Sequence, residues 1–361
     1  MGKFLRVLFL AAGLLGLALL PAFAGGPILG TAPRPQSSPQ GAVAHADSEV
    51  AAAEYYLYIP LAQARPNVWL NIQSRQAVLD FYNAEYLSYE GTAMGWTGNR
   101  ATCNAGTTAQ AFRDAILRRI NYFRAMAGVP PVTRLLDDYN REAQEAALMM
   151  SANQSLSHSP PANWLCYTAE GAEAAGRSNL CLGCYAWGAI TAYMGDAGSG
   201  NYAVGHRRWV LYPQTQEMGT GDVPFADGYT APAANALWVF DSHMGEPRPA
   251  TREAFVAWPP PGYVPYTVVF PRWSFSYAGA DFTTASVSMV SGGNNLAVSL
   301  APVANGYGEN TLVWVPAGLS DGAPWPKPQA DTAYTVTIHH VIIAGQSRDF
   351  SYTVTVFAPG S

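Results

Sequence analysis

Charged residues are scarce in this chain of 361 residues: they make up 12% of it, and the formal net charge is −5. Nucleic-acid binding depends on clustered lysines and arginines, so this balance gives no electrostatic reason to expect a nucleic-acid partner. Long apolar runs are missing beyond the N-terminus, so no later segment is long enough to span a membrane as a helix. The sequence also has no H-E-x-x-H motif and no recognisable Ser-His-Asp order.

The N-terminal segment has the pattern of a secretory signal peptide. Lys3 and Arg6 precede an apolar run over 7–20, and small residues at 22 and 24 suit cleavage after residue 24. The run is shorter than the ~20 residues that a spanning helix needs, and an uncleaved anchor is the alternative. Residues 25–66 are rich in Ala, Gly, Pro and Ser, which predicts a disordered spacer. We therefore expect a secreted protein with no stable membrane span after cleavage.

Only four cysteines occur, which allows two disulfides in three pairings. Export permits such bridges, and we favour a local one between Cys181 and Cys184. Cys103 would then close a long loop to Cys166. In a reducing compartment the C-x-x-C at 181–184 would instead indicate a redox motif or half of a zinc site.

Apolar residues at three- and four-residue steps predict the helices of a first domain, which we place at 67–248. Two longer helices are expected at 108–126 and 138–152, a third at 187–194 and a helical turn at 78–86. Thr107 or Thr108 is expected to cap the first helix, and Asp137 or Asp138 the second. Residues 204–211 fit either a strand or a short helix.

Segments with period-two alternation and β-branched residues dominate the chain after position 249. They lie at 287–289, 297–300, 312–315, 334–338, 341–343 and 350–356. Several short strands at this spacing predict an all-β, immunoglobulin-like sandwich over 249–361. This region has no cysteine, so no disulfide can join its two sheets. The expected fold class of the whole chain is α+β.

Four segments between 108 and 222 carry a resemblance to a known family. The segment 121–130 (NYFRAMAGVP) is similar to a first-helix signature, and 143–158 to a second helix ending at a cleft histidine. The segment 205–208 (GHRR) resembles the one that carries a second histidine, and 218–221 (MGTG) the glycine-rich strand after it. The family is the CAP superfamily of cysteine-rich secretory, antigen 5 and pathogenesis-related 1 proteins. The resemblance implies an α-β-α sandwich with a central antiparallel sheet and an open cleft.

In that family the cleft carries two histidines and two acidic residues, and in some members it binds a divalent metal. His158 and His206 match the histidines, and Asp196 roughly matches one acidic position. Where the family often has Glu-Asn, this chain has Ser178 and Asn179. A serine cannot supply the charge of a carboxylate, so metal affinity and acid–base chemistry are weakened.

Two glutamates in the segment before Ser178 could replace the missing carboxylate. They are Glu170 and Glu173, which we place in a loop. The alternative is that both are solvated loop charges.

Three functions are compatible with these residues, because a neutral imidazole can bind a metal, accept a proton or hydrogen-bond a ligand. The favoured one is a secreted protein whose His158/His206 cleft binds a small lipid, glycan or peptide, with or without a divalent metal on the two histidines. The sandwich would then act as a spacer or an adhesive platform. The second is a metal-assisted extracellular hydrolase, a peptidase, using these histidines and Asp196. The third is a thiol oxidoreductase using Cys181 and Cys184. Against the two functions that use the histidines stands the alternative that each histidine is only structural.

Overall fold

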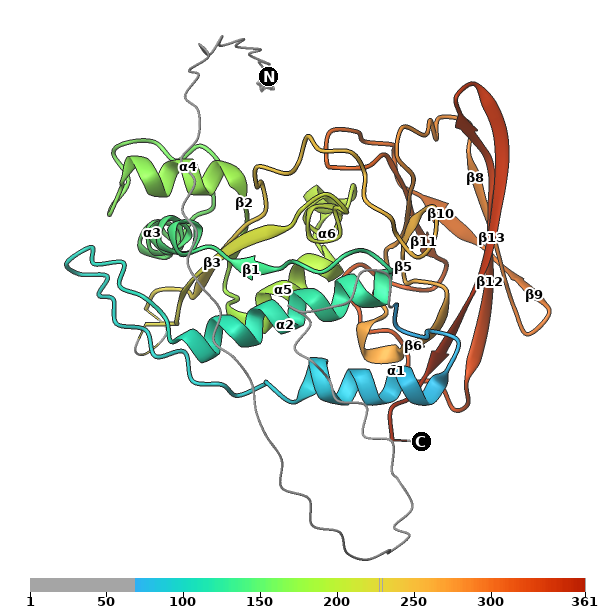
Figure 1. Cartoon of the computed structure of the whole chain (residues 1–361), viewed down its shortest axis with the longest axis horizontal. Helices are drawn as coiled ribbons and strands as arrows, with labels where there is room; N and C mark the ends of the chain where they lie inside the picture. The colour runs from blue at the N-terminus through green and yellow to red at the C-terminus, as the bar shows by residue number, and fades with distance from the viewer. Residues whose placement is uncertain (1–68, 227, 229, 361) are drawn as a thin grey trace, which may run out of the picture. The chain divides into compact units, whose positions relative to one another are not determined.

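The computed structural model describes residues 69–360 except 227 and 229 (Figure 1). The predicted signal peptide (1–24) and the predicted spacer (25–66) lie outside the described residues. The described part combines helices with three β-sheets, so the predicted α+β class is confirmed.

A four-stranded sheet forms the centre of the first half, with strand order β1-β3-β4-β2. Its strands are β1 (Arg134–Leu135), β2 (Ser178–Leu182), β3 (Glu217–Val223) and β4 (Ala234–Trp238). Strands β2, β4 and β3 pair antiparallel. The short β1 pairs parallel with β3, so the sheet is not purely antiparallel as the resemblance implied. Strand β2 ends the sheet, and the cleft described below lies beside it.

Helices cover both faces of this sheet, which gives the predicted α-β-α layering (Figure 1). On one face lie α3 (Asp137–Asn153) and α4 (Ala169–Arg177), and on the other α2 (Gln110–Ala127) and α5 (Ala186–Gly195). Helix α3 lies very close to β3: a Cβ atom at Gly221 would come within 2.2 Å of the Ala143 carbonyl oxygen. Only glycine leaves room for a helix at that distance.

The long helices lie where the periodicity predicts them, but their caps differ. Helix α2 begins at Gln110 and has no side-chain cap, because its N-cap residue is Ala109, whose methyl group cannot accept a hydrogen bond; Thr107 and Thr108 lie before that position. Helix α3 begins at Asp137, so Asp137 and Asp138 lie in its first turn, where their charges favour the helix dipole. The ambiguous segment 204–211 is helical: α6 spans Gly205–Val210.

Two sheets form the C-terminal β-sandwich, with strand orders β10-β11-β7-β5 and β6-β13-β12-β8-β9. The expected strands at 334–338 and 341–343 form one long strand, β12, with an irregularity between Ile338 and Val341. The strands are β5 (Val256–Trp258), β6 (Gly262–Pro265), β7 (Trp273–Ser276), β8 (Ser286–Ser291), β9 (Asn294–Leu296), β10 (Val298–Leu300), β11 (Thr311–Pro316), β12 (Thr332–Ile343) and β13 (Gln346–Phe357).

The helical half and the sandwich share one continuous hydrophobic core. Phe123 of α2 contacts Trp258 of β5 with ring centroids 5.2 Å apart. The short helix α1 (Arg75–Phe81) and the π-helix η2 (Tyr82–Leu87) precede α2 and lie where a helical turn is predicted. Just before α1, the Ile72 carbonyl accepts the N–H of Tyr263 in β6. The sandwich is therefore packed into the rest of the protein and does not form a detached module.

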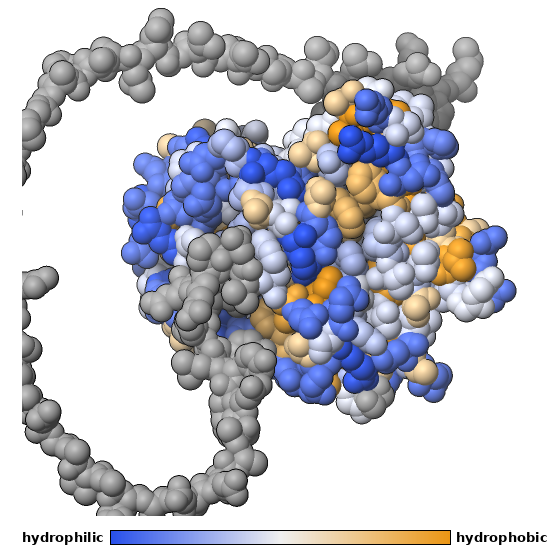
Figure 2. All heavy atoms as spheres, turned by 45° about the vertical axis from the view of Figure 1, so that its right-hand side comes forward, coloured by the Kyte–Doolittle hydropathy of each residue, from blue (hydrophilic) through white to orange (hydrophobic). Residues whose placement is uncertain are grey.

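In the view of Figure 2, apolar residues form patches that are separated by hydrophilic residues. The large apolar side chains with the greatest exposure are scattered over several elements, among them Leu156, Leu165 and Tyr307. Leu156 and Tyr307 both border the cleft described below.

A buried carboxyl joins the sheet to α5. Asp222 of β3 is fully buried, and its Oδ1 accepts the N–H of Ala186 at the start of α5 at 2.6 Å. Asp222 also accepts hydrogen bonds from Thr220 and Asn235. Burial raises the pKa of Asp222 from 3.8 to about 6, against the opposing effect of these bonds.

We expect the D222N variant to lose the fall in stability with rising pH that Asp222 causes. Between pH ~4 and ~6 folded Asp222 keeps a proton that the unfolded chain has released, so stability falls as pH rises. The fall amounts to about 3 kcal/mol and is complete above pH ~6. Asparagine keeps the shape and carries no charge, so the variant should gain stability relative to the parent over this range. Urea unfolding from pH 4 to 7 measures the difference, with the exposed D138N as control; parallel curves for parent and D222N would refute the assignment.

Candidate functional site

Two adjoining cavities, of about 690 and 350 Å³, open beside the edge strand β2. Both are lined by His158, His206 and Asn201. His158 follows α3 and His206 lies in α6, so segments 48 residues apart in sequence contribute to one cleft. The histidine pair stands at the junction of the two cavities.

Asp196 holds His206 in place. It is 1% exposed, and its Oδ1 lies 2.7 Å from His206 Nδ1. Its other oxygen accepts the backbone N–H groups of His206 and Arg207, at 3.0 and 3.3 Å. Asp196 thus caps the first turn of α6 and orients the imidazole that this turn carries. The ring also stacks on Tyr193 at 5.4 Å between centroids.

The hydrogen bonds of the two histidine rings define which nitrogen of each neutral ring carries the proton. His158 Nδ1 lies 2.8 Å from the carbonyl oxygen of Ala175, a group that can only accept. Nδ1 of the neutral ring must therefore carry the proton, and the same holds for His206 beside the Asp196 carboxylate. Each Nε2 is then left with a lone pair, which can accept a hydrogen bond or a proton, or bind a metal.

The two residues at the divergent acidic position have different roles. Asn179 is 2% exposed, and its Nδ2 donates to the backbone carbonyl of His206 at 3.0 Å, which ties β2 to α6. Ser178 is 5% exposed and borders the smaller cavity. Among the residues that the structure describes, its Oγ has no hydrogen-bond partner.

Neither glutamate proposed as a substitute lines the two cavities. Both lie on α4 and not in a loop, and Glu173 pairs with Arg177 one turn later at 3.0 Å, with 56% of its side chain exposed. The solvated alternative therefore describes Glu173 better. The loop prediction failed because Ala169–Arg177 has only small apolar residues; its helix starts at the Thr168 cap, which accepts the N–H of Gly171.

The donor set at the cleft fits a resident metal ion poorly. Over residues 69–360, apart from 227 and 229, no group of three or more His, Cys, Asp and Glu side chains is arranged to hold one. Catalytic zinc sites use three protein ligands. Here the two Nε2 atoms supply two donors, while Asp196 is engaged by His206 and by α6. Asp196 is thus a positioning residue.

The sandwich supplies part of the cleft wall, which the sequence did not predict. Phe270, Pro271 and Ala323 border the larger cavity, and Tyr307 borders the smaller one. The Tyr307 ring lies against Gly205 at the start of α6, where an added Cβ would approach it to 2.8 Å. No local pattern could have connected these residues to His206, because 64 to 117 positions separate them in the chain.

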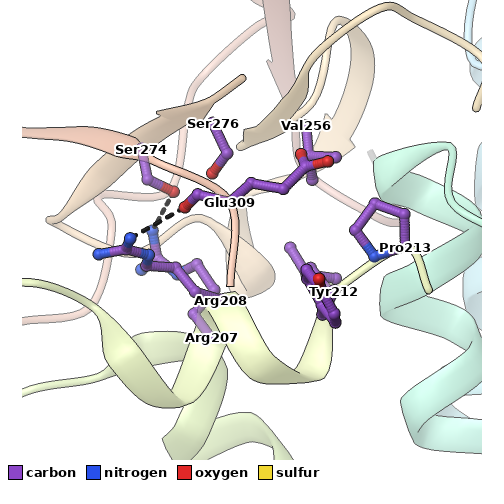
Figure 3. A pocket seen from close by; sticks show the side chains of 9 residues that line it. Arg207, Arg208, Tyr212, Pro213, Val256, Ser274, Ser276 and Glu309 are labelled. Atoms are coloured by element: carbon purple, nitrogen blue, oxygen red, sulfur yellow. Dashed lines mark hydrogen bonds between the residues drawn. The ribbon is translucent and has the colours of Figure 1, made fainter. Parts of the chain in front are cut away.

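Two buried arginines of α6 hold the sandwich against the cleft (Figure 3). Arg207 donates to the Arg272 carbonyl at 2.8 Å and to Ser274 Oγ at 3.0 Å. Arg208 donates to the carbonyls of Ala304 and Glu309, at 2.7 and 2.9 Å. Burial lowers the pKa of Arg207 to about 9 and that of Arg208 to about 10, so both remain charged at neutral pH.

Both disulfides of the favoured pairing are present, Cys103–Cys166 and Cys181–Cys184. The first spans 63 positions and ties the segment before α2 to the loop after α3 that also carries His158. The second closes the turn at the end of β2, and Cys181 itself borders the larger cavity. The described residues include no free cysteine.

The sandwich contains a hydrogen-bonded Ser–His–Asp set that the sequence did not reveal. Ser288 Oγ lies 3.0 Å from His339 Nε2, and His339 Nδ1 lies 2.9 Å from Asp349 Oδ2. The order of contacts matches that of a nucleophile, a base and an orienting acid. However, Ser288 is exposed, and 33% and 53% of the His339 and Asp349 side chains are exposed. Catalysis needs a water-excluded site with oxyanion donors, so we assign no catalytic role to these three exposed residues.

Comparison with known proteins agrees with this architecture. Residues 117–241 match the family model CAP, described as the Cysteine-rich secretory protein family. The chain is also similar to the Golgi-associated plant pathogenesis-related protein 1 of Homo sapiens. The two are 26% identical over 131 residues, which cover 34% of this chain and 79% of that protein. The family match includes the cleft residues His158, Asp196 and His206. About a third of the chain, residues 117–241, therefore matches a CAP domain.

Proposed function

We propose that this protein is secreted and that its His158/His206 cleft binds a small ligand. The observation that carries the proposal is a pair of imidazoles that line both cavities and whose Nδ1 atoms are both engaged by protein groups, which leaves Nε2 as the acceptor of each neutral ring. Binding sites are typically concave and largely apolar, with a few fixed polar groups, and this cleft has that composition. The polar groups are held by buried partners and need little reordering when a ligand binds.

Secretion is supported by the two disulfides, which persist in oxidising compartments. The family model is itself described by secretory proteins. Within the described residues, no helix is both long and apolar enough to cross a membrane.

The experiment uses histidine ring NMR on the full chain, with probes from each ligand class: uncharged peptides, neutral oligosaccharides and lysolipids. We expect at least one class to shift the His158 and His206 ring signals together, in a saturable way. The H158A/H206A variant should weaken that binding by about tenfold or more, because it removes two hydrogen-bond acceptors. H339A, which removes an exposed histidine of the sandwich, is the matched control. If no class shifts the rings, or if H339A weakens binding as much, the proposal is wrong.

A metal-assisted peptidase is the second candidate, and only the Nε2 lone pairs of His158 and His206 favour it. Two ligands without a third fit it poorly, so we route no step through a metal. Activity on a peptide library with and without chelator tests it. Cleavage that chelator and the H158A/H206A variant both abolish would establish the peptidase, whereas cleavage lost in S288A would instead indicate the sandwich Ser–His–Asp set. The oxidoreductase has no support beyond the Cys181–Cys184 bridge, which a purely structural disulfide gives equally.

A further inference from the structure

Strand β2 runs along the cleft with its free edge. It is the last strand of its sheet among the described residues, and its only sheet partner there is β4. Leu180 and Leu182 face the cluster beneath α3 and α4, whereas Cys181 packs toward the opposite core. Yet all three residues line the larger cavity. Because successive side chains point to opposite faces of a sheet, a cavity that reaches all three lies beside the edge.

The hydrogen-bond register defines which backbone groups point to that edge. The N–H of Gly183 donates to the Ala233 carbonyl, and the N–H of Val239 donates to the Arg177 carbonyl. In an antiparallel pair such bonds recur at every second residue. Asn179 and Cys181 therefore bond to β4, and the N–H and C=O groups of Ser178, Leu180 and Leu182 point away from β4, to the side of β2 that has no strand partner among the described residues.

A polypeptide backbone in extended form matches this row of groups. It presents donors and acceptors at the same two-residue spacing, which is how peptides add a strand to an exposed sheet edge. Ser178 adds a second, independent observation, because its buried Oγ borders the smaller cavity and lacks a partner among the described residues. A buried hydroxyl without a partner costs free energy that a bound ligand could recover.

The remaining walls define the chemistry of such a peptide. Asp196 is the only Asp, Glu, Lys or Arg among the residues that line the two cavities, and its carboxylate is held by His206. An uncharged peptide therefore suits the cleft. Phe270, Pro271 and Ala323 of the C-terminal half give the larger cavity an apolar wall opposite β2, and Tyr307 gives the smaller one an aromatic wall.

We propose that the cleft takes an uncharged, extended peptide of about five residues as an added strand on β2, with the sandwich forming its outer wall. The length follows from the five residues of β2. This inference rests on the proposed binding function and specifies its ligand class. It also gives the sandwich a role in specificity that a spacer would not have.

The experiment combines amide hydrogen exchange with ligand chemistry on the full, disulfide-bonded chain. The probe is a pool of acetylated and amidated hexapeptides of Ala, Val, Leu, Phe, Ser and Thr, from which the tightest binder is chosen. At saturation we expect exchange of the Leu180 and Leu182 amides to slow by about tenfold or more. The Asn179 and Cys181 amides, already bonded to β4, should change little and serve as internal controls. Single N-methylation along the peptide should weaken binding at every second position.

The outcomes separate this inference from the function on which it rests. If an oligosaccharide or a lysolipid shifts the His158 and His206 rings while no hexapeptide does, the cleft is a binding site and strand addition is wrong. Strand addition is equally wrong if a hexapeptide shifts the rings but neither exchange nor N-methylation shows the two-residue alternation. If no probe of any class shifts the rings, the binding function itself fails.

Discussion

The R207A variant is expected to lose about 3–5 kcal/mol of unfolding free energy, the range measured when one partner of a buried charged group is removed. Arg207 is 1% exposed. It donates to the carbonyl of Met194 at 2.6 Å, in addition to Arg272 and Ser274 of the sandwich. Truncation would leave these acceptors buried and unpaired, would remove the favourable charge interaction between Arg207 and Asp196, and would open a cavity.

Urea unfolding at pH 7 measures the effect. R207K keeps the charge but not the planar set of donors, and it should lose most of the same free energy. R141A is the matched control, because the Arg141 side chain is 54% exposed and its ion pairs lie at the surface. Its expected effect is within about 0.5 kcal/mol. If R207A cost no more than R141A, the proposed attachment of the sandwich through α6 would be wrong.

Removing the Cys103–Cys166 bridge by the C103A/C166A double substitution is expected to cost about 4 kcal/mol. The bridge closes a loop of 63 positions, and its loss frees that loop in the unfolded chain. The bridge between Cys181 and Cys184 spans three positions, so C181A/C184A should cost only about 2 kcal/mol.

The two double variants are each other's control, because both remove one disulfide. Thermal and urea unfolding, with the remaining bridge verified by mass spectrometry, give the two differences. Equal losses would contradict a stabilisation that grows with loop length. A C103A/C166A variant that retains stability but shifts the His158 ring signals would assign the long bridge to shaping the histidine loop rather than to stability.

Elements with strong periodicity could be predicted from the sequence. Helices α2 and α3 carry large or regularly spaced apolar residues, and strands such as β12 and β13 alternate clearly. Helix α4 was missed because its apolar residues are alanine and glycine, which give little periodic contrast. The Thr107/Thr108 cap was wrong because the helix starts at Gln110, which makes Ala109 the N-cap residue.

The candidate site was predictable only as far as its motifs reach. His158, His206 and Asp196 were identified from segments that resemble a known family. The resemblance could not show that both carboxylate oxygens of Asp196 are hydrogen-bonded by residues of α6. Those bonds depend on the left-handed backbone conformation of Asp196 and Val204. Nor could it reveal the contribution of Phe270 and Tyr307, which reach the cleft only because the sandwich packs against α6.

The six residues of α6 carry two duties on neighbouring positions. His206 lines the cleft, and the next residue, Arg207, is buried and hydrogen-bonds to Arg272 of the C-terminal half. Any substitution that slid the sandwich along this helix would turn the imidazole as well. Exchange of the C-terminal half for another domain is therefore expected to change the orientation of His206 in the cleft as well.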